Sequence, residues 1–176
     1  MQEDPIVIVG AARTPMGGFQ GSLTPLSAPE LGGYAIQGAV ERAGVAPKDV
    51  QDLIMGLCLF AGVKQAPARQ AAHLAGIPWD AGATTISKMC GSAMKATMLA
   101  HDNILAGSHD IMVAGGMESM TNAPYILPKA RGGYRLGNGD TVRDHMFMDG
   151  LEDAYDEGRL MGTFAEDTAE HYQFTR

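Results

Sequence analysis

Short apolar runs rich in β-branched residues alternate with helical stretches over Ile6–Ala114, and this alternation constrains the fold more than any other feature. A continuous apolar run is typical of a strand buried on both faces, and strands that alternate with helices form parallel sheets. We expect four strands, at Ile6–Val9, Leu53–Leu59, Thr84–Ile86 and Ile111–Ala114. The pattern predicts an α/β fold with a mostly parallel mixed sheet flanked by helices.

Helix start and stop signals lie between the expected strands. Ser27 is followed three residues later by Glu30, which is the signature of a capping box, and Gly44 is a typical C-terminal stop. A helix is therefore predicted to run from Ser27 to about Ala43. Further helices are expected over Ala68–Ala75 and Gly91–Leu105.

Composition excludes several classes of protein. The net charge of −7 argues against nucleic-acid binding, because no basic surface is available to neutralise phosphates. No apolar run approaches the roughly 20 residues that cross a bilayer, so no membrane association is expected. The acidic start, Met1–Asp4, is unlike a secretory signal. Two cysteines give neither a disulfide framework nor a metal-ligand spacing, which favours a metal-free protein in a reducing cytoplasm.

The composition of the sequence changes after Met120. Prolines and paired glycines interrupt any long element there, and charged residues then become frequent. We therefore predict two regions, residues 1–120 and residues 121–176. The chain ends just after a helix-like stretch, Ala165–Tyr172, without a stop signal, so a truncated second region is expected.

Cys90 lies where an expected strand, Thr84–Ile86, turns into a helix. The unpaired N–H groups and the positive dipole end of a helix favour a thiolate, and small neighbours such as Gly91 leave room for a substrate. This placement predicts a nucleophilic cysteine, although position alone equally allows a small buried side chain. Cys58, inside an expected apolar strand, is predicted to be structural.

The segment Ser87–Ala96 resembles the acylation segment of the thiolases. Further segments resemble other blocks of the same family in the same order, so the resemblance covers essentially all 176 residues; they are Ala12–Phe19, Met55–Ala72, Gly115–Met120, Arg131–Gly137 and Met161–Glu166. The Arg131–Gly137 block resembles a loop that builds tetramers in some members. The Met161–Glu166 block resembles a segment that borders the coenzyme A pocket.

The resemblance implies an acyl-CoA C-acyltransferase with a layered thiolase-type α/β half and the start of a loop domain. Cys90 would be acylated by acetyl-CoA or another acyl-CoA, with its own N–H in the oxyanion hole, before Claisen condensation or thiolysis. Leu151 and Met161 would line the coenzyme A pocket, and coenzyme A thioester would be a substrate rather than a resident cofactor. Gln65 and Arg69 would support the site wall and a dimer interface, or form an ordinary polar pair. A homodimer or homotetramer is implied.

The chain also departs from the family pattern. Ser87 replaces an Asn, Ala93 a Gly and Leu160 a His, and no segment supplies the family's catalytic His or second Cys. The fragment is therefore expected to be inactive alone and to expose an apolar face until the C-terminal half of the same enzyme covers it. Three alternatives remain: a ketosynthase or hydroxymethylglutaryl-CoA synthase relative, a non-catalytic acyl-CoA-binding module, and a subunit of a split enzyme.

Overall fold

The structure is a computed structural model that describes residues 5–137, 139 and 141–176. The chain forms two compact units, Met1–Asn122 and Ala123–Arg176, and each is considered by itself. The acidic Met1–Asp4 stretch, for which no secretory role is expected, lies outside the described residues.

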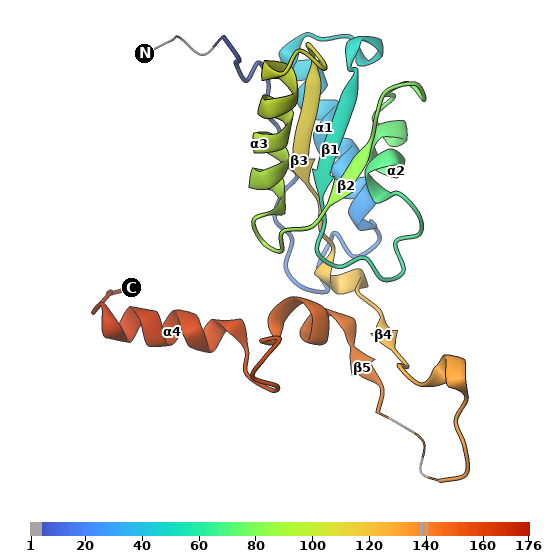
Figure 1. Cartoon of the computed structure of the whole chain (residues 1–176), viewed down its shortest axis with the longest axis vertical. Helices are drawn as coiled ribbons and strands as arrows, with labels where there is room; N and C mark the ends of the chain where they lie inside the picture. Colours follow the sequence, from blue (N-terminus) through green and yellow to red (C-terminus); the bar gives the residue numbers. More distant parts are fainter. Residues whose placement is uncertain (1–4, 138, 140) are drawn as a thin grey trace. The chain divides into compact units, whose positions relative to one another are not determined.

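The first unit is built on a three-stranded sheet in which β1 lies between β2 and β3 (Figure 1). The strands are β1 (Asp52–Gly56), β2 (Thr84–Ile86) and β3 (Met112–Gly116). Both pairings are parallel, and Ile54 of β1 is opposite Thr84 on one side and Ala114 on the other. The prediction of a parallel α/β sheet is confirmed.

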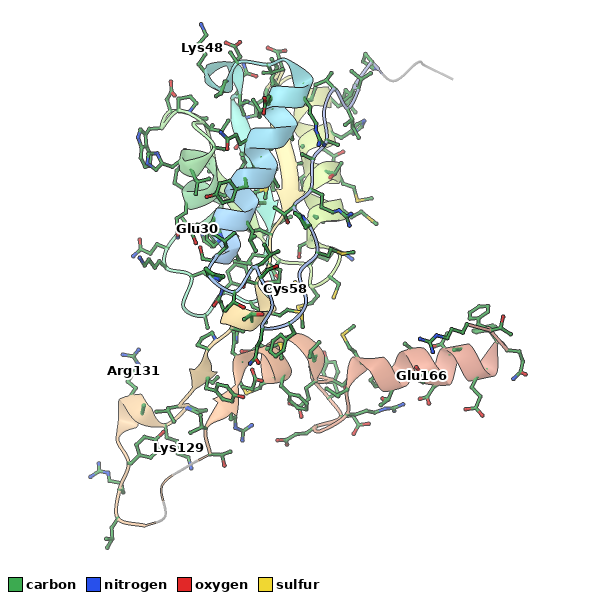
Figure 2. The ribbon with its side chains drawn as sticks, turned by 180° about the vertical axis from the view of Figure 1, so that it is seen from behind. Glu30, Lys48, Cys58, Lys129, Arg131 and Glu166 are labelled. Carbon is green, nitrogen blue, oxygen red and sulfur yellow. The ribbon has the colours of Figure 1, made fainter. Side chains whose placement is uncertain are left out.

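Helices cover both faces of this sheet. α1 (Ala28–Ala43) and α2 (Pro67–Leu74) pack against each other on one face, whereas α3 (Ser92–Leu105) packs on β1 and β3 from the other. Figure 2, which views the unit from behind, shows α1 in front of the strands. The main core lies on the α1–α2 side and includes Ile36, Leu53, Met55, Leu57, Ala68, Ala71 and Met117.

The capping box predicted at the start of α1 is confirmed. The backbone N–H of Ser27 donates to Glu30 Oε2 at 2.7 Å, and the Glu30 N–H donates back to Ser27 Oγ at 3.4 Å. Gly44 ends the helix in the left-handed conformation, with φ of 66°, which a glycine adopts without steric cost.

Ser27→Ala is expected to lower the free energy of unfolding by about 1 kcal/mol, because the helix loses its N-cap acceptor. Hydrogen bonds from the Ser27 hydroxyl, and then from its N–H, lower the pKa of Glu30 below its ordinary value of 4.5. A lowered folded-state pKa stabilises the fold above pH 4.5, and this stability disappears as the pH falls through the lowered value. Urea unfolding should therefore show that the difference in unfolding free energy between Ser27→Ala and the parent chain becomes smaller at acidic pH. A difference that does not change with pH would contradict this account.

The strand predicted at Ile6–Val9 is wrong, because this segment belongs to no helix or strand. A strand requires backbone hydrogen bonds to a neighbouring strand, and among the described residues β3 is paired only with β1. Val7, Ile8 and Val9 are largely exposed, with 81% of the Ile8 surface accessible. The apolar side chains of this segment predicted a buried strand, but the described residues leave most of them exposed.

A groove of about 540 Å³ lies between this N-terminal segment and the free side of β3. Its lining is mainly apolar and includes Ile6–Ala12, Val40, Ile104 and Met112–Gly116. Met94 and Met98 on α3 are also exposed, by 71% and 55%. The exposed apolar surface predicted from the sequence is therefore present.

The described part of the second unit contains short sheet elements, a 3-10 turn η3 (Ala130–Gly132) and longer helical segments. β4 (Tyr125–Ile126) pairs antiparallel with β5 (Arg143–Asp144), and a π-helical turn, η4 (Phe147–Leu151), follows. The last helix is α4 (Met161–His171), which begins earlier than the predicted stretch Ala165–Tyr172. Among the described residues, no helix is both long and apolar enough to span a membrane.

Candidate active site

Cys90 lies in the turn between the end of β2 at Ile86 and the start of α3 at Ser92, and it is exposed. Two hydrogen bonds of Ser92 close this turn. The Lys88 N–H donates to Ser92 Oγ at 2.8 Å, and the hydroxyl donates to the Met89 carbonyl at 2.5 Å. The structure therefore places Cys90 where the sequence predicted it, beside the first N–H groups of a helix, which lack intrahelical partners.

Met89, directly before Cys90, has a left-handed backbone with φ of 48°. This conformation is unfavourable for side chains other than glycine and asparagine, and it is most unfavourable for β-branched ones. The turn that presents the cysteine therefore carries backbone strain, as many functional turns do.

Met89→Val is expected to lower the free energy of unfolding by about 1–2 kcal/mol, because a β-branched side chain must enter the left-handed region. Met89→Gly should be neutral or stabilising. The matched control is Met98→Val on the exposed side of α3, which should cost less than about 0.7 kcal/mol. Equal losses in the two valine variants, measured by urea unfolding, would show that Met89 carries no special strain.

The first turn of α3 packs directly against two glycines of the sheet, Gly56 and Gly116. An ideal Cβ on Gly56 would lie 2.5 Å from Ser92 Cβ, and one on Gly116 would lie 2.9 Å from Ala93 Cβ. The absence of these side chains lets the helix start approach the sheet closely. The extra methyl of Ala93, expected near the sulfur, packs against Gly116 at the end of β3.

Cys58 lies beyond the end of β1, so the prediction that it is inside a strand is wrong. The Glu118 carboxylate shapes this segment, because it accepts from the N–H of Cys58 at 2.9 Å and of Leu59 at 3.2 Å. These bonds replace a strand ladder. Burial and then the charge of Glu118 raise the pKa of the Cys58 thiol to about 11. Glu118 was not predicted as a site residue, although it lies in Gly115–Met120, one of the segments that resemble the thiolases.

Iodoacetamide is expected to label Cys90 well before Cys58 at pH 8. With a pKa of about 11, only roughly one Cys58 thiol in a thousand is ionised at that pH. Labelling of Cys58 should accelerate steadily as the pH rises toward 11, and Glu118→Gln should accelerate it at every pH. Tryptic mass analysis separates the two sites. Equal labelling rates at pH 8 would contradict the shielding of Cys58.

Gln65 and Arg69 make local hydrogen bonds around α2. Arg69 Nη2 donates to the Ala81 carbonyl at 2.6 Å, and the Gln65 carbonyl accepts from Gln70 Nε2 at 2.7 Å. Within the described part of the chain, Arg69 Nη1 is buried without a partner. These contacts fix the loops beside α2, and a role at a dimer interface stays a prediction.

Leu151 and Met161 belong to the second unit, whereas Cys90 belongs to the first. Leu151 ends η4 and is half-buried, and Met161 begins α4 with 48% of its surface exposed. Their neighbours Glu152 and Leu160 form an antiparallel bridge, which holds these two backbone segments side by side. Their assignment to a coenzyme A pocket shared with Cys90 stays a prediction. No group of three or more metal-ligating side chains occurs among the described residues.

A parallel α/β sheet that presents an exposed cysteine on a strand-to-helix turn has the arrangement expected of an enzyme that uses a thiol nucleophile. The family model described as "Thiolase, N-terminal domain" matches residues 6–176. The chain therefore belongs to the thiolase family, as its motifs predicted, and a ketosynthase or hydroxymethylglutaryl-CoA synthase is not favoured.

Individual relatives agree with this membership. The chain is 52% identical over 171 residues to acetyl-CoA acetyltransferase of Cupriavidus necator, covering 97% of the chain and 43% of that protein. It is 51% identical over 176 residues to acetyl-CoA acetyltransferase 1 of Arabidopsis thaliana, covering 100% and 42%. The chain thus spans less than half the length of these relatives.

A solved structure also resembles the whole fold. The Acat5 thiolase from Ascaris suum, crystallised in complex with coenzyme A, superposes with a TM-score of 0.88 at 38% identity. The match covers 96% of this chain and 43% of that one. The thiolase-type α/β fold predicted from the sequence is confirmed.

Proposed function

We propose that this chain is the N-terminal part of a thiolase-type acyl-CoA C-acyltransferase in which Cys90 accepts the acyl group. The observation that carries the proposal is the contrast between the two thiols. Cys90 is exposed on a turn held by Ser92, whereas Cys58 is shielded beside Glu118. The names of the relatives, acetyl-CoA acetyltransferases, supply the substrate class.

The first chemical step is acyl transfer to Cys90. Its sulfur attacks the thioester carbonyl carbon, the carbon–sulfur bond to coenzyme A breaks, and the coenzyme A thiolate leaves. The backbone N–H of Cys90 itself would help to stabilise the oxyanion of the tetrahedral intermediate, whereas the N–H groups of Gly91 and Ser92 already donate to the Lys88 and Met89 carbonyls. The acyl group then passes to the α-carbon of a second acyl-CoA, or to free coenzyme A in the thiolytic direction.

Condensation needs a base for the α-proton of the second acyl-CoA. We assign that base to the C-terminal half of the same enzyme, because the relatives extend over more than twice the matched length. The apolar groove beside β3 gives that half a surface to cover, since large exposed apolar patches mark interaction sites. The chain alone is expected to be acylated at most.

The remaining assignments follow from the same family membership. Coenzyme A thioester is the substrate and not a permanently bound cofactor, and Leu151 and Met161 line its pocket. The Ascaris structure in complex with coenzyme A supports this ligand. A cytoplasmic homodimer or homotetramer is proposed, with Arg131–Gly137 in the tetramer contact. The name of a Gibberella zeae relative, 47% identical over 172 residues, includes the word cytosolic.

The test is an acylation assay read by mass. The purified chain is incubated with acetyl-CoA, with and without a separately expressed C-terminal half from the Cupriavidus relative. Digestion should find the acetyl group on the Cys90 peptide, in greater yield when that half is present. Acetylation of Cys58 instead, or of neither cysteine under both conditions, would overturn the assignment of Cys90. Binding of acetyl-CoA without acetylation would favour a non-catalytic acyl-CoA-binding module.

A further inference from the structure

The two cysteines flank one tight backbone contact. Gly56 at the end of β1 touches Ser92 at the start of α3, where an added Cβ would come within 2.5 Å of Ser92 Cβ and 2.7 Å of its carbonyl carbon. Cys58 follows Gly56 by two residues, and Cys90 precedes Ser92 by two residues. The contact between β1 and α3 thus brings two segments together that are far apart in the sequence, each with a thiol beside the contact.

Ser92 lies between the two segments. Its hydroxyl accepts from the Lys88 N–H and donates to the Met89 carbonyl, which holds the turn of Cys90. Ser92 and Cys90 are both among the groups that act on the pKa of the Cys58 thiol. Together with the contact of Gly56 and Ser92, this places Cys58 beside the turn that presents Cys90.

The two thiols differ in exposure, and this difference determines which of them an oxidant reaches first. Cys90 is exposed and meets a dissolved oxidant first, whereas Cys58 is half-buried. The Glu118 carboxylate accepts the N–H of Cys58 at 2.9 Å, so a carboxylate lies beside this cysteine. A carboxylate in this position can take the thiol proton when the sulfur reacts. An exposed cysteine beside a protected one is the arrangement of a peroxidatic and a resolving thiol.

We propose that Cys58 is a resolving cysteine, which forms a reversible disulfide with Cys90 after a peroxide has oxidised Cys90. The disulfide would withdraw the exposed sulfur from acyl transfer and protect it from irreversible oxidation. The formation of the bond itself requires no acyl-CoA chemistry. Its regulatory meaning rests on the acyl-accepting role proposed for Cys90.

The electrons and atoms balance in two steps. The Cys90 thiolate attacks hydrogen peroxide, the O–O bond breaks, and a sulfenic acid and hydroxide form, the latter taking up a proton to become water. The Cys58 sulfur then attacks the sulfenic sulfur, its proton passes to Glu118 and on to the departing hydroxyl, and a second water leaves. Two electrons pass from the two thiols to one peroxide. A dithiol such as dithiothreitol restores both thiols.

Trypsin places the two cysteines in different peptides, residues 49–64 and 89–95, so the bond can be read directly. The whole chain is treated with a small excess of hydrogen peroxide, unfolded in urea, blocked with iodoacetamide and digested without reductant. The expected result is a linked pair of these peptides that dithiothreitol separates. Links between two copies of residues 89–95, sulfinic acid on Cys90 with Cys58 still alkylated, or two unchanged alkylated peptides would each overturn the proposal.

Cys58→Ser and Cys58→Val are the matched variants, and either is sufficient if the other folds poorly. In both, the thiol of Cys90 recovered by dithiothreitol after peroxide should fall to near zero as sulfinic acid accumulates, whereas the parent chain recovers most of it. Recovery equal to that of the parent would overturn the proposal. Because mapping uses no acetyl-CoA, a chain that forms the disulfide but is never acetylated would overturn only the proposed acyl transfer.

Discussion

Replacing Cys90 with serine is expected to abolish the covalent acetyl adduct and to lower acyl transfer in the completed enzyme by at least about three orders of magnitude. A thiol ionises near neutral pH, whereas a serine hydroxyl requires a well-placed base before it can attack a thioester. The turn around position 90 should keep its shape, because Ser92 and the backbone supply its hydrogen bonds. The measurements are mass analysis of the adduct and the rate of acetoacetyl-CoA thiolysis.

Cys58→Ser is the matched control for this loss. It removes the other cysteine of the chain, which lies beside the same turn but is shielded, and the adduct on Cys90 should persist. An adduct that survives Cys90→Ser, or one that disappears only in Cys58→Ser, would transfer the nucleophilic role away from Cys90. Near-ultraviolet circular dichroism of both variants reports whether the fold is kept.

Gly56→Ala is expected to have the largest effect on stability, a loss of about 1–3 kcal/mol. The added methyl would lie 2.7 Å from the Ser92 carbonyl carbon and 2.9 Å from the Ala93 nitrogen, which are backbone atoms that no rotamer change can move. The start of α3 must therefore shift, and the turn that carries Cys90 shifts with it. We expect slower acetylation of Cys90 as well as a lower midpoint of urea unfolding.

Gly18→Ala provides the comparison, because an added Cβ at Gly18 meets nothing within 4 Å. Its unfolding midpoint should stay close to that of the parent chain. If the two alanine variants unfold at the same urea concentration, the close approach of β1 and α3 is not what limits stability.

Much of the fold follows from local signals in the sequence. The helix from Ser27 was predictable because its capping box and its terminal Gly44 act within one turn of each end. The strand Thr84–Ile86 was predicted with its observed bounds. Ile6–Val9 shows where local reasoning ends, since a strand depends on a neighbour that the pattern of one segment does not reveal.

The candidate site was predictable only in part. Cys90 was predicted because a strand, a cysteine and a helix start follow one another directly in the chain, and because Ser87–Ala96 resembles the acylation segment of the thiolases. Glu118 and the contact of Gly56 with Ser92 were not found, because each joins elements far apart in the sequence. Cys58 was placed inside a strand because its neighbours are apolar, but Glu118 takes the backbone N–H of Cys58 that a ladder would otherwise use.

The turn that presents Cys90 takes its shape from residues 86–95 and from the glycines beneath it, all within the first unit. Because these contacts involve no residue of 123–176, substitutions in that unit are expected to leave the shape of the turn unchanged. The proposed acyl-accepting role of Cys90 and the sequence of the second unit can therefore vary separately.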